Sequence, residues 1–271
     1  LDEHGKEMHG SWGNMIDATD AFERMGADVM RWQYCAQPPD RNLLFGFGPA
    51  QEIEDTRQRL ATTHGVEVAY DGADMFNADA IELMTKSAIH RFGRIDILVN
   101  NAGIQHVAPI DEFPAAKWDA ILAINLTAAF HTIRHALPAM KRQGSGRIVN
   151  VASAHALVAS PFKSAYVAAK HGIAGLTKTV ALEVAEQNIT CNAVCPGYVL
   201  TPLVQQQIPD TARARGISED EVVRNVLLAA QPTRKFVSVE EVAALVRFLC
   251  GSDAASITGA VLPIEGGWTA H

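Results

Sequence analysis

The chain has 271 residues, a net charge of −7, and 48% hydrophobic against 20% charged residues, which is typical of a globular protein built on one α/β domain. The excess of acidic residues, 30 against 23 basic ones, argues against nucleic acid or an anionic membrane as a partner. The longest apolar runs are too short to span a membrane, and the four scattered cysteines and acidic first residues favour a cytoplasmic protein without a signal peptide.

Helical and strand patterns alternate from Gln51 onward. Helical patterns cover 51–64, 74–91, 115–142, 164–187, 218–230 and 239–251. Strand patterns cover 66–70, 95–99, 146–152, 189–195 and 260–264. Apolar strands separated by long helices predict an α/β fold with a doubly wound parallel sheet. Ligands bind such sheets at the carboxyl ends of the strands, which here are marked by Asn100, Ser153 and Pro196-Gly197.

Four polar residues form a candidate catalytic group. Tyr166 and Lys170 stand four residues apart on one predicted helix, so they share a face. A tyrosine hydroxyl titrates near about 10, and we expect the neighbouring ammonium to lower that pKa by favouring the phenolate. Ser153 ends the preceding strand, where it can hydrogen-bond a reacting oxygen, and Asn125 can hold a water beside the lysine. A Tyr-x-x-x-Lys pair alone usually lies on a solvated surface, but its combination with the polar strand ends indicates an active site.

Residues 51–271 resemble the short-chain dehydrogenase/reductase family. The motifs that carry the resemblance are Asn100-Asn101-Ala102-Gly103, Asn125, Ser153, Tyr166-Val167-Ala168-Ala169-Lys170 and Pro196-Gly197-Tyr198-Val199-Leu200-Thr201. The resemblance implies a Rossmann-like fold and a catalytic tetrad of Asn125, Ser153, Tyr166 and Lys170, in which Tyr166 takes the alcohol proton while hydride passes to NAD. It extends to members that oxidise D-3-hydroxybutyrate to acetoacetate, through residues 103–110, Ser153-Ala154-His155 and residues 266–270.

The same resemblance implies further site residues. The substrate residues are Gln105, His155, Lys163, Gln207 and Trp268. The cofactor residues are Asp74, Asn100, Ala102, Gly103, Pro196, Gly197, Val199 and Thr201, together with Tyr166 and Lys170. Amides, an imidazole and an ammonium suit a small hydroxy acid with one carboxylate, and residues 203–230 are expected to form a substrate lid. Tyr198 stands where a tryptophan is more usual.

Three further expectations concern the cofactor, the assembly and metal binding. No Arg or Lys occurs from Leu43 to Gly48, so a 2′-phosphate finds no partner there and NAD is favoured over its phosphorylated form. Relatives are usually tetramers, which makes a homo-oligomer the expected state. Cys191 and Cys195 lack a second pair of metal ligands, so we expect no metal site.

The first 50 residues do not continue the resemblance. They contain no strand followed by the glycine-rich turn that holds a pyrophosphate, so the fold lacks its first strand and that turn. Residues 2–14 and 26–32 instead resemble a class I aminoacyl-tRNA synthetase of the isoleucine type, with Gly10 in place of the phosphate-binding lysine. We therefore expect an atypical segment over residues 1–50, a dehydrogenase core over residues 51–271, and a fusion seam at Gly46-Phe47-Gly48.

Three functions stay open at this point. The first is that of an NAD-dependent dehydrogenase. The second is that of a catalytically impaired fusion or remnant that pairs with intact dehydrogenase subunits. The third is that of a synthetase fragment that binds RNA or a nucleotide. The acidic charge and Gly10 argue against the last of these.

Overall fold

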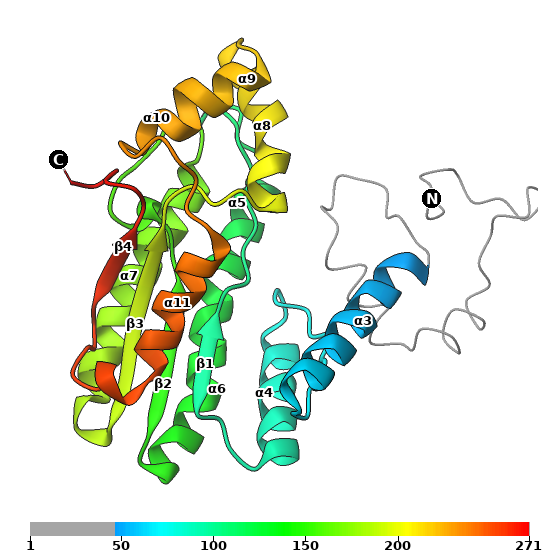
Figure 1. Cartoon of the computed structure of the whole chain (residues 1–271), viewed down its shortest axis with the longest axis vertical. Helices are drawn as coiled ribbons and strands as arrows, with labels where there is room; N and C mark the ends of the chain where they lie inside the picture. The colour runs from blue at the N-terminus through cyan, green and yellow to red at the C-terminus, as the bar shows by residue number, and fades with distance from the viewer. Residues whose placement is uncertain (1–46, 271) are drawn as a thin grey trace, which may run out of the picture. The chain divides into compact units, whose positions relative to one another are not determined.

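The computed structural model describes residues 47–270 (Figure 1). The predictions for residues 1–46, including most of the synthetase-like segment and Gly46 of the seam, lie outside the described residues. The chain divides after Met84 into two units, which are described separately below. Helix α4 (Ala78–Phe92) runs across the division.

The first unit is built around helix α3 (Phe47–His64) and the segment that follows it. Arg57 ties the two together, because its Nη2 lies 2.6 Å from Oε1 of Glu54 and its Nη1 donates to the Val68 carbonyl at 3.4 Å. The predicted strand over residues 66–70 is wrong. Within residues 47–270 no strand pairs with this segment, and Val66 is 54% exposed, so the apolar residues have no sheet to join.

Helix α4 begins later than predicted, at Ala78 instead of Asp74. The Asn77 side chain sets this start, since its Oδ1 accepts hydrogen bonds from the backbone N–H groups of Asp79 (2.9 Å) and Ala80 (3.2 Å). Asp74 forms a turn before it and accepts from the N–H of Phe76. The helix ends as predicted before Gly93, which has a φ of +77°.

The second unit contains a parallel sheet in the order β1-β2-β3-β4. Its strands are β1 (Ile97–Asn100), β2 (Gly146–Val151), β3 (Ile189–Pro196) and β4 (Val261–Ile264). The predicted α/β fold with a parallel sheet is therefore confirmed, and these four strands lie within one or two residues of their predicted ranges.

Helices connect the strands of the second unit. They are α5 (Ala115–Leu122), the π-helical turn η2 (Ala123–Thr127), α6 (Ala128–Gln143), the 3₁₀ turn η3 (Ala154–Ala156), α7 (Ser164–Glu183), the 3₁₀ turn η4 (Ala185–Gln187), α8 (Pro202–Arg215), α9 (Glu219–Glu221), the π-helical turn η5 (Val222–Leu227), α10 (Leu228–Ala230), α11 (Val239–Cys250) and the 3₁₀ turn η6 (Ser252–Ala254). The sequence pattern did not predict α8, which occupies the first part of the expected lid.

Alternate residues of the strands pack against opposite layers of helices. Ile148 of β2 joins a buried cluster with Met140 of α6 and Val180 of α7. The next residue, Val149, faces the other way and packs with Leu249 of α11. Figure 1 shows α11 in front of the sheet and α6 and α7 behind it. Both faces of β2 and β3 are thus covered, as their continuous apolar character requires.

Strand β1 differs from this pattern. It was expected to be a buried strand, but Ile97 is 49% and Val99 43% exposed. The reason lies in its position: β1 is the edge of the sheet, and within residues 47–270 only β2 pairs with it.

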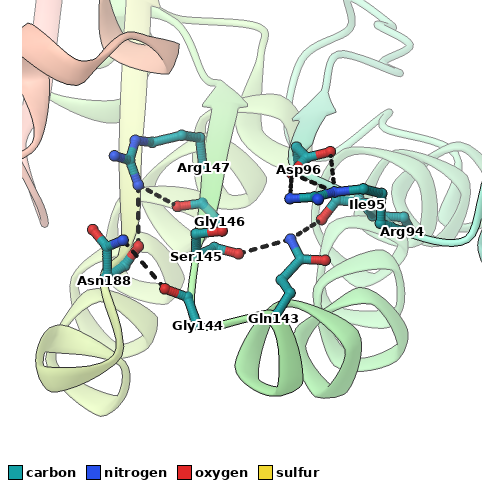
Figure 2. A network of polar contacts seen from close by, with 9 residues as sticks. All are labelled: Arg94, Ile95, Asp96, Gln143, Gly144, Ser145, Gly146, Arg147 and Asn188. Carbon is teal, nitrogen blue, oxygen red and sulfur yellow. Dashed lines mark hydrogen bonds and ion pairs between the residues drawn. The ribbon is translucent and has the colours of Figure 1, made fainter.

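A polar network joins the amino ends of the strands (Figure 2). Gln143 donates through Nε2 to the carbonyls of Ile95 (2.7 Å) and Ser145 (2.8 Å). Arg147 donates through Nη1 to the Asn188 carbonyl at 3.1 Å, and Asn188 donates through Nδ2 to the Gly144 carbonyl at 3.2 Å. These bonds link the segments that enter β1, β2 and β3, and so fix the relative register of their opposite, carboxyl ends.

None of the helices within residues 47–270 combines the length and the apolar character that crossing a membrane requires.

Candidate active site

A cavity of about 560 Å³ lies at the carboxyl ends of β1, β2 and β3. Eight of the predicted site residues line it, namely Gly103, Ser153, Tyr166, Lys170, Pro196, Gly197, Val199 and Thr201. The expected convergence of the polar strand ends is therefore met for Ser153, Pro196 and Gly197, whereas Asn100 does not line the cavity.

Tyr166 and Lys170 enter the cavity from helix α7. The Lys170 Nζ lies 5.5 Å from the centroid of the Tyr166 ring and donates to the carbonyl of Val151 at 2.9 Å. Burial lowers the pKa of Lys170 to about 8. Burial also raises the pKa of Tyr166 to about 12, although a hydrogen bond with Ser153 opposes that rise. The predicted lowering of the tyrosine pKa is wrong, because desolvation of the phenolate outweighs the hydrogen bond with Ser153.

Ser153 lies where β2 leads into the turn η3. Its Oγ accepts the backbone N–H of His155 at 3.1 Å and lies 3.3 Å from Nδ1 of the same residue. The other ring nitrogen, Nε2, is 3.0 Å from the Ser160 Oγ. Burial lowers the pKa of His155 to about 3, with a further contribution from the charge on Lys163. His155 is therefore a neutral imidazole that fixes the position of the Ser153 hydroxyl.

Asn125 lies in the π-helical turn η2 and is buried. Its Oδ1 accepts the N–H of Ile104 at 2.8 Å, and its Nδ2 donates to the Ile104 carbonyl at 2.9 Å. A π-helical turn inserts one residue into a helix and is frequent at functional sites. Here it turns Asn125 toward the loop that carries Gly103, whose missing Cβ would stand 3.5 Å from Oδ1 of Asn125 and 3.9 Å from Nζ of Lys170.

The loop after β3 is held by close packing at Gly197. A Cβ there would come within 2.9 Å of the Glu265 Cα and would overlap the buried side chain of Gln231. Gln231 accepts the N–H of Tyr198 and donates to the Lys235 carbonyl. These contacts set the course of the chain toward Val199 and Thr201.

Two predicted cofactor residues of the second unit, Asn100 and Ala102, do not line the cavity. Asn100 donates to Oδ1 of Asn150 (2.8 Å) and accepts from the Thr132 hydroxyl (2.6 Å), so its amide belongs to a network below the cavity. Its neighbour Asn101 lines the cavity, whereas Ala102 does not. Asp74 belongs to the first unit.

The sequence analysis did not predict one wall of the cavity. It is formed by one face of α11, with Val239, Val242, Ala243, Val246 and Arg247. Apolar residues at this spacing are a helical face, so the signal was present, but it does not distinguish a cavity wall from an ordinary buried face.

A second cavity, of about 160 Å³, is lined by Lys163, Tyr198 and Trp268. The Tyr198 and Trp268 rings stack with centroids 5.2 Å apart, and the Lys163 Nζ donates to the Tyr198 hydroxyl at 3.2 Å. The His155 ring lies edge-on to Trp268 (5.0 Å between centroids) and also to Tyr166 of the first cavity (5.8 Å). His155 therefore connects the two cavities, and three predicted substrate residues come together here.

The two predicted substrate glutamines are less clearly placed. Gln105 has both amide atoms buried without a hydrogen-bond partner among the described residues, and a water or a polar ligand would supply those partners. Gln207 lies on α8 and is half-buried. Neither residue lines the two cavities.

No group of three or more His, Cys, Asp or Glu side chains in residues 47–270 is arranged to hold a metal ion. Cys191 and Cys195 are buried, and burial raises their thiol pKa to about 12 and about 11.

Comparison with known proteins agrees with this geometry. A family profile described as enoyl-(acyl carrier protein) reductase matches residues 44–269. A protein of Rhizobium meliloti named D-beta-hydroxybutyrate dehydrogenase is 57% identical over 84% of this chain and 89% of its own length. A protein of the same name from Cupriavidus necator is 53% identical over 84% and 88%. Among solved structures, NAD⁺-bound xylitol dehydrogenase matches with a TM-score of 0.75 at 32% identity, covering 80% of this chain and 85% of that one.

Proposed function

Because the chain belongs to the short-chain dehydrogenase/reductase family, we propose that it catalyses the NAD-dependent oxidation of D-3-hydroxybutyrate to acetoacetate and the reverse reaction. The observation that carries the proposal is that Ser153, Tyr166 and Lys170 line one cavity with five of the residues expected to hold the cofactor. The names of the two bacterial relatives support the choice of substrate.

The lining of the larger cavity fits the nicotinamide end of NAD. Gly103, Pro196 and Gly197 present little side chain to it, while Thr201 brings a hydroxyl. These residues, with Val199, would hold the nicotinamide ring, which when bound would accept hydride from the alcohol carbon and carry a positive charge. The NAD⁺-bound structural relative supports this cofactor.

Tyr166 holds the proton that the reaction moves. With a pKa of about 12, its hydroxyl is neutral at pH 7 and is ready to protonate the ketone oxygen in the reductive direction. In the oxidative direction the same oxygen takes the alcohol proton, and positive charge in the cavity, including the Lys170 ammonium, lowers the cost of its phenolate. Ser153 donates to the substrate oxygen, and the neutral His155 keeps that hydroxyl in place.

The substrate lies beside His155, with its hydroxyl at Tyr166 and its carboxylate toward Lys163. The Lys163 ammonium is buried and donates a hydrogen bond to the Tyr198 hydroxyl. No carboxylate of residues 47–270 pairs with it. A buried ammonium without an acidic partner is costly, and a bound carboxylate removes that cost. The methyl end of a four-carbon acid then meets the stacked rings of Tyr198 and Trp268.

The experiment that tests the proposal is NADH formation by the purified chain with D-3-hydroxybutyrate. We expect turnover with the D acid and NAD, little with the L acid, and less with NADP. A soluble and folded sample that forms no NADH from the D acid would contradict the proposal.

The second candidate, an impaired fusion or remnant that pairs with intact dehydrogenase subunits, is favoured by the exposed edge of β1. Ile97 and Val99 are exposed there, and unpaired strand edges attract further strands. Mixing the chain with the intact Rhizobium meliloti relative and weighing the products by light scattering tests it. Mixed oligomers from a chain that is inactive by itself would favour this candidate, and separate species would exclude it.

A further inference from the structure

The second cavity carries two cations and no acid. Lys163 and Arg215 both line it, and none of its lining residues is Asp or Glu. At about 160 Å³ it is smaller than sites for drug-sized ligands, which measure about 300–1,000 Å³. A ligand group that enters it therefore approaches both cations, and the absence of an acid favours an anion.

Arg215 is held at this cavity by the residue that precedes Lys163. Its Cζ lies 5.6 Å from the centroid of the Phe162 ring, within the range of a cation–π contact. Phe162 has a φ of +70°, rare for a bulky residue, and its carbonyl accepts the N–H of Ala108 at 3.0 Å. Strained backbone is frequent where a side chain must be aimed at a ligand. The strain places the Phe162 ring under Arg215 and Lys163 next to it in the chain.

The two arginines at the end of α8 differ in their partners. Arg213 is paired with Asp210, with Nη1 and Oδ1 2.9 Å apart. Arg215 has no acidic partner among residues 47–270 and is exposed to solvent at the cavity. Its charge also reaches Lys163, because together with burial it lowers the pKa of that ammonium to about 8. The neighbouring Arg213 therefore serves as an internal control for the charge of the helix end.

We propose that Arg215 is a substrate-recognition residue that binds the same carboxylate as Lys163 and so favours hydroxy acids with a free carboxylate over their uncharged esters. This inference rests on the proposed function. The guanidinium offers two parallel N–H donors to a carboxylate, which an ammonium does not. Lys163 supplies a buried charge at the inner side of the cavity, and Arg215 closes its solvent side. Esters and amides of the same acids lack the charge that both residues bind.

The test compares Arg215→Gln with Arg213→Gln and Arg215→Lys in the full-length chain. For D-3-hydroxybutyrate we expect Arg215→Gln to raise KM by about tenfold or more, with kcat and the Kd of NADH unchanged. For the uncharged methyl ester of the acid, KM stays the same. Arg215→Lys recovers part of the affinity, and Arg213→Gln behaves as the unmodified chain. A structural role for Arg215 would instead change the KM of both substrates and the Kd of NADH together.

A KM for the acid that is unchanged in Arg215→Gln overturns the inference. If the unmodified chain has no turnover, calorimetric binding of D-3-hydroxybutyrate in the presence of NADH replaces KM. Weaker binding by Arg215→Gln than by Arg213→Gln then upholds the recognition role although the proposed function has failed. Equal binding, or no binding by any of the chains, overturns the recognition role.

Discussion

The side chain of Asn125 makes both hydrogen bonds to the backbone of Ile104, accepting from its N–H at 2.8 Å and donating to its carbonyl at 2.9 Å. One buried amide thus fixes the loop that follows β1 to the π-helical turn of the long helix. That loop carries Gly103 into the larger cavity.

Asn125→Ala tests this relationship. It leaves a backbone donor and a backbone acceptor of Ile104 without their partner, so we expect the free energy of unfolding to fall by about 2–4 kcal/mol. Asn125→Asp keeps the acceptor for the N–H but sets a carboxylate oxygen against the Ile104 carbonyl, so it should be destabilising as well. Chemical denaturation measures both, and an unfolding free energy equal to that of the unmodified chain would contradict the account.

His155 makes stability depend on pH. Its folded pKa of about 3 lies below the ordinary value of 6.5, so the unfolded chain takes up a proton that the folded chain excludes. The stability present above about pH 6.5 is therefore lost as the pH falls toward about 3, by about 1.4 kcal/mol per pH unit or about 2 kcal/mol at pH 5. We expect His155→Gln to flatten this part of the curve of unfolding free energy against pH. The matched control is His90→Gln, at an exposed position of α4.

Lys163 makes substrate affinity depend on pH. The affinity is lost as the pH rises, whereas the stability that depends on His155 is lost as the pH falls. Burial and Arg215 lower its pKa to about 8, so the free site loses its charge above that pH. We expect kcat/KM for D-3-hydroxybutyrate, divided by kcat/KM for its methyl ester, to fall about tenfold per pH unit above pH 8. The ratio removes the titration of Lys170 and Tyr166, which both substrates share. A ratio that stays constant up to pH 10 would show that the carboxylate is not bound by a titrating ammonium.

Gly197 provides a steric prediction. A methyl group at this position meets the Glu265 Cα at 2.9 Å and the Gln231 side chain, so Gly197→Ala should cost about 1–3 kcal/mol of stability. It should also displace Tyr198, since Gln231 holds the Tyr198 N–H. Gly175 on α7 has open space around it, so Gly175→Ala should be neutral or slightly stabilising. Equal thermal midpoints for the two variants would refute the packing argument.

The hydrophobic pattern of the sequence was sufficient to predict the four strands of the sheet. The strands at 146–151, 189–196 and 261–264 have apolar runs that a covered parallel sheet buries, and the strand at 97–100 joins the same sheet at its edge. The run at 66–70 has the same propensity, but strand formation needs a neighbour, and none of the described strands pairs with it. The strand propensity of residues 66–70 therefore predicts an extended segment, but it does not predict whether another strand pairs with that segment.

The part of the site that depends on the spacing of residues along one helix could be predicted from the sequence. Tyr166 and Lys170 share a face because a helix brings residues four apart together. Which of Asn100 and Asn101 faces the cavity depends on the register of β1 against β2, which the sequence does not state. The second cavity depends on the stacking of Tyr198 on Trp268, two residues that lie 70 positions apart. Such contacts follow from tertiary packing alone.

The most direct test of the account is the rate of NADH formation by Tyr166→Phe. This variant keeps the half-buried ring next to Lys170 and His155 and removes only the hydroxyl that moves the proton. We predict that kcat with D-3-hydroxybutyrate falls by about 10²- to 10⁴-fold, while the thermal midpoint stays at its original value. A variant that keeps the original kcat would show that the cavity at Ser153, Tyr166 and Lys170 is not the site of the reaction.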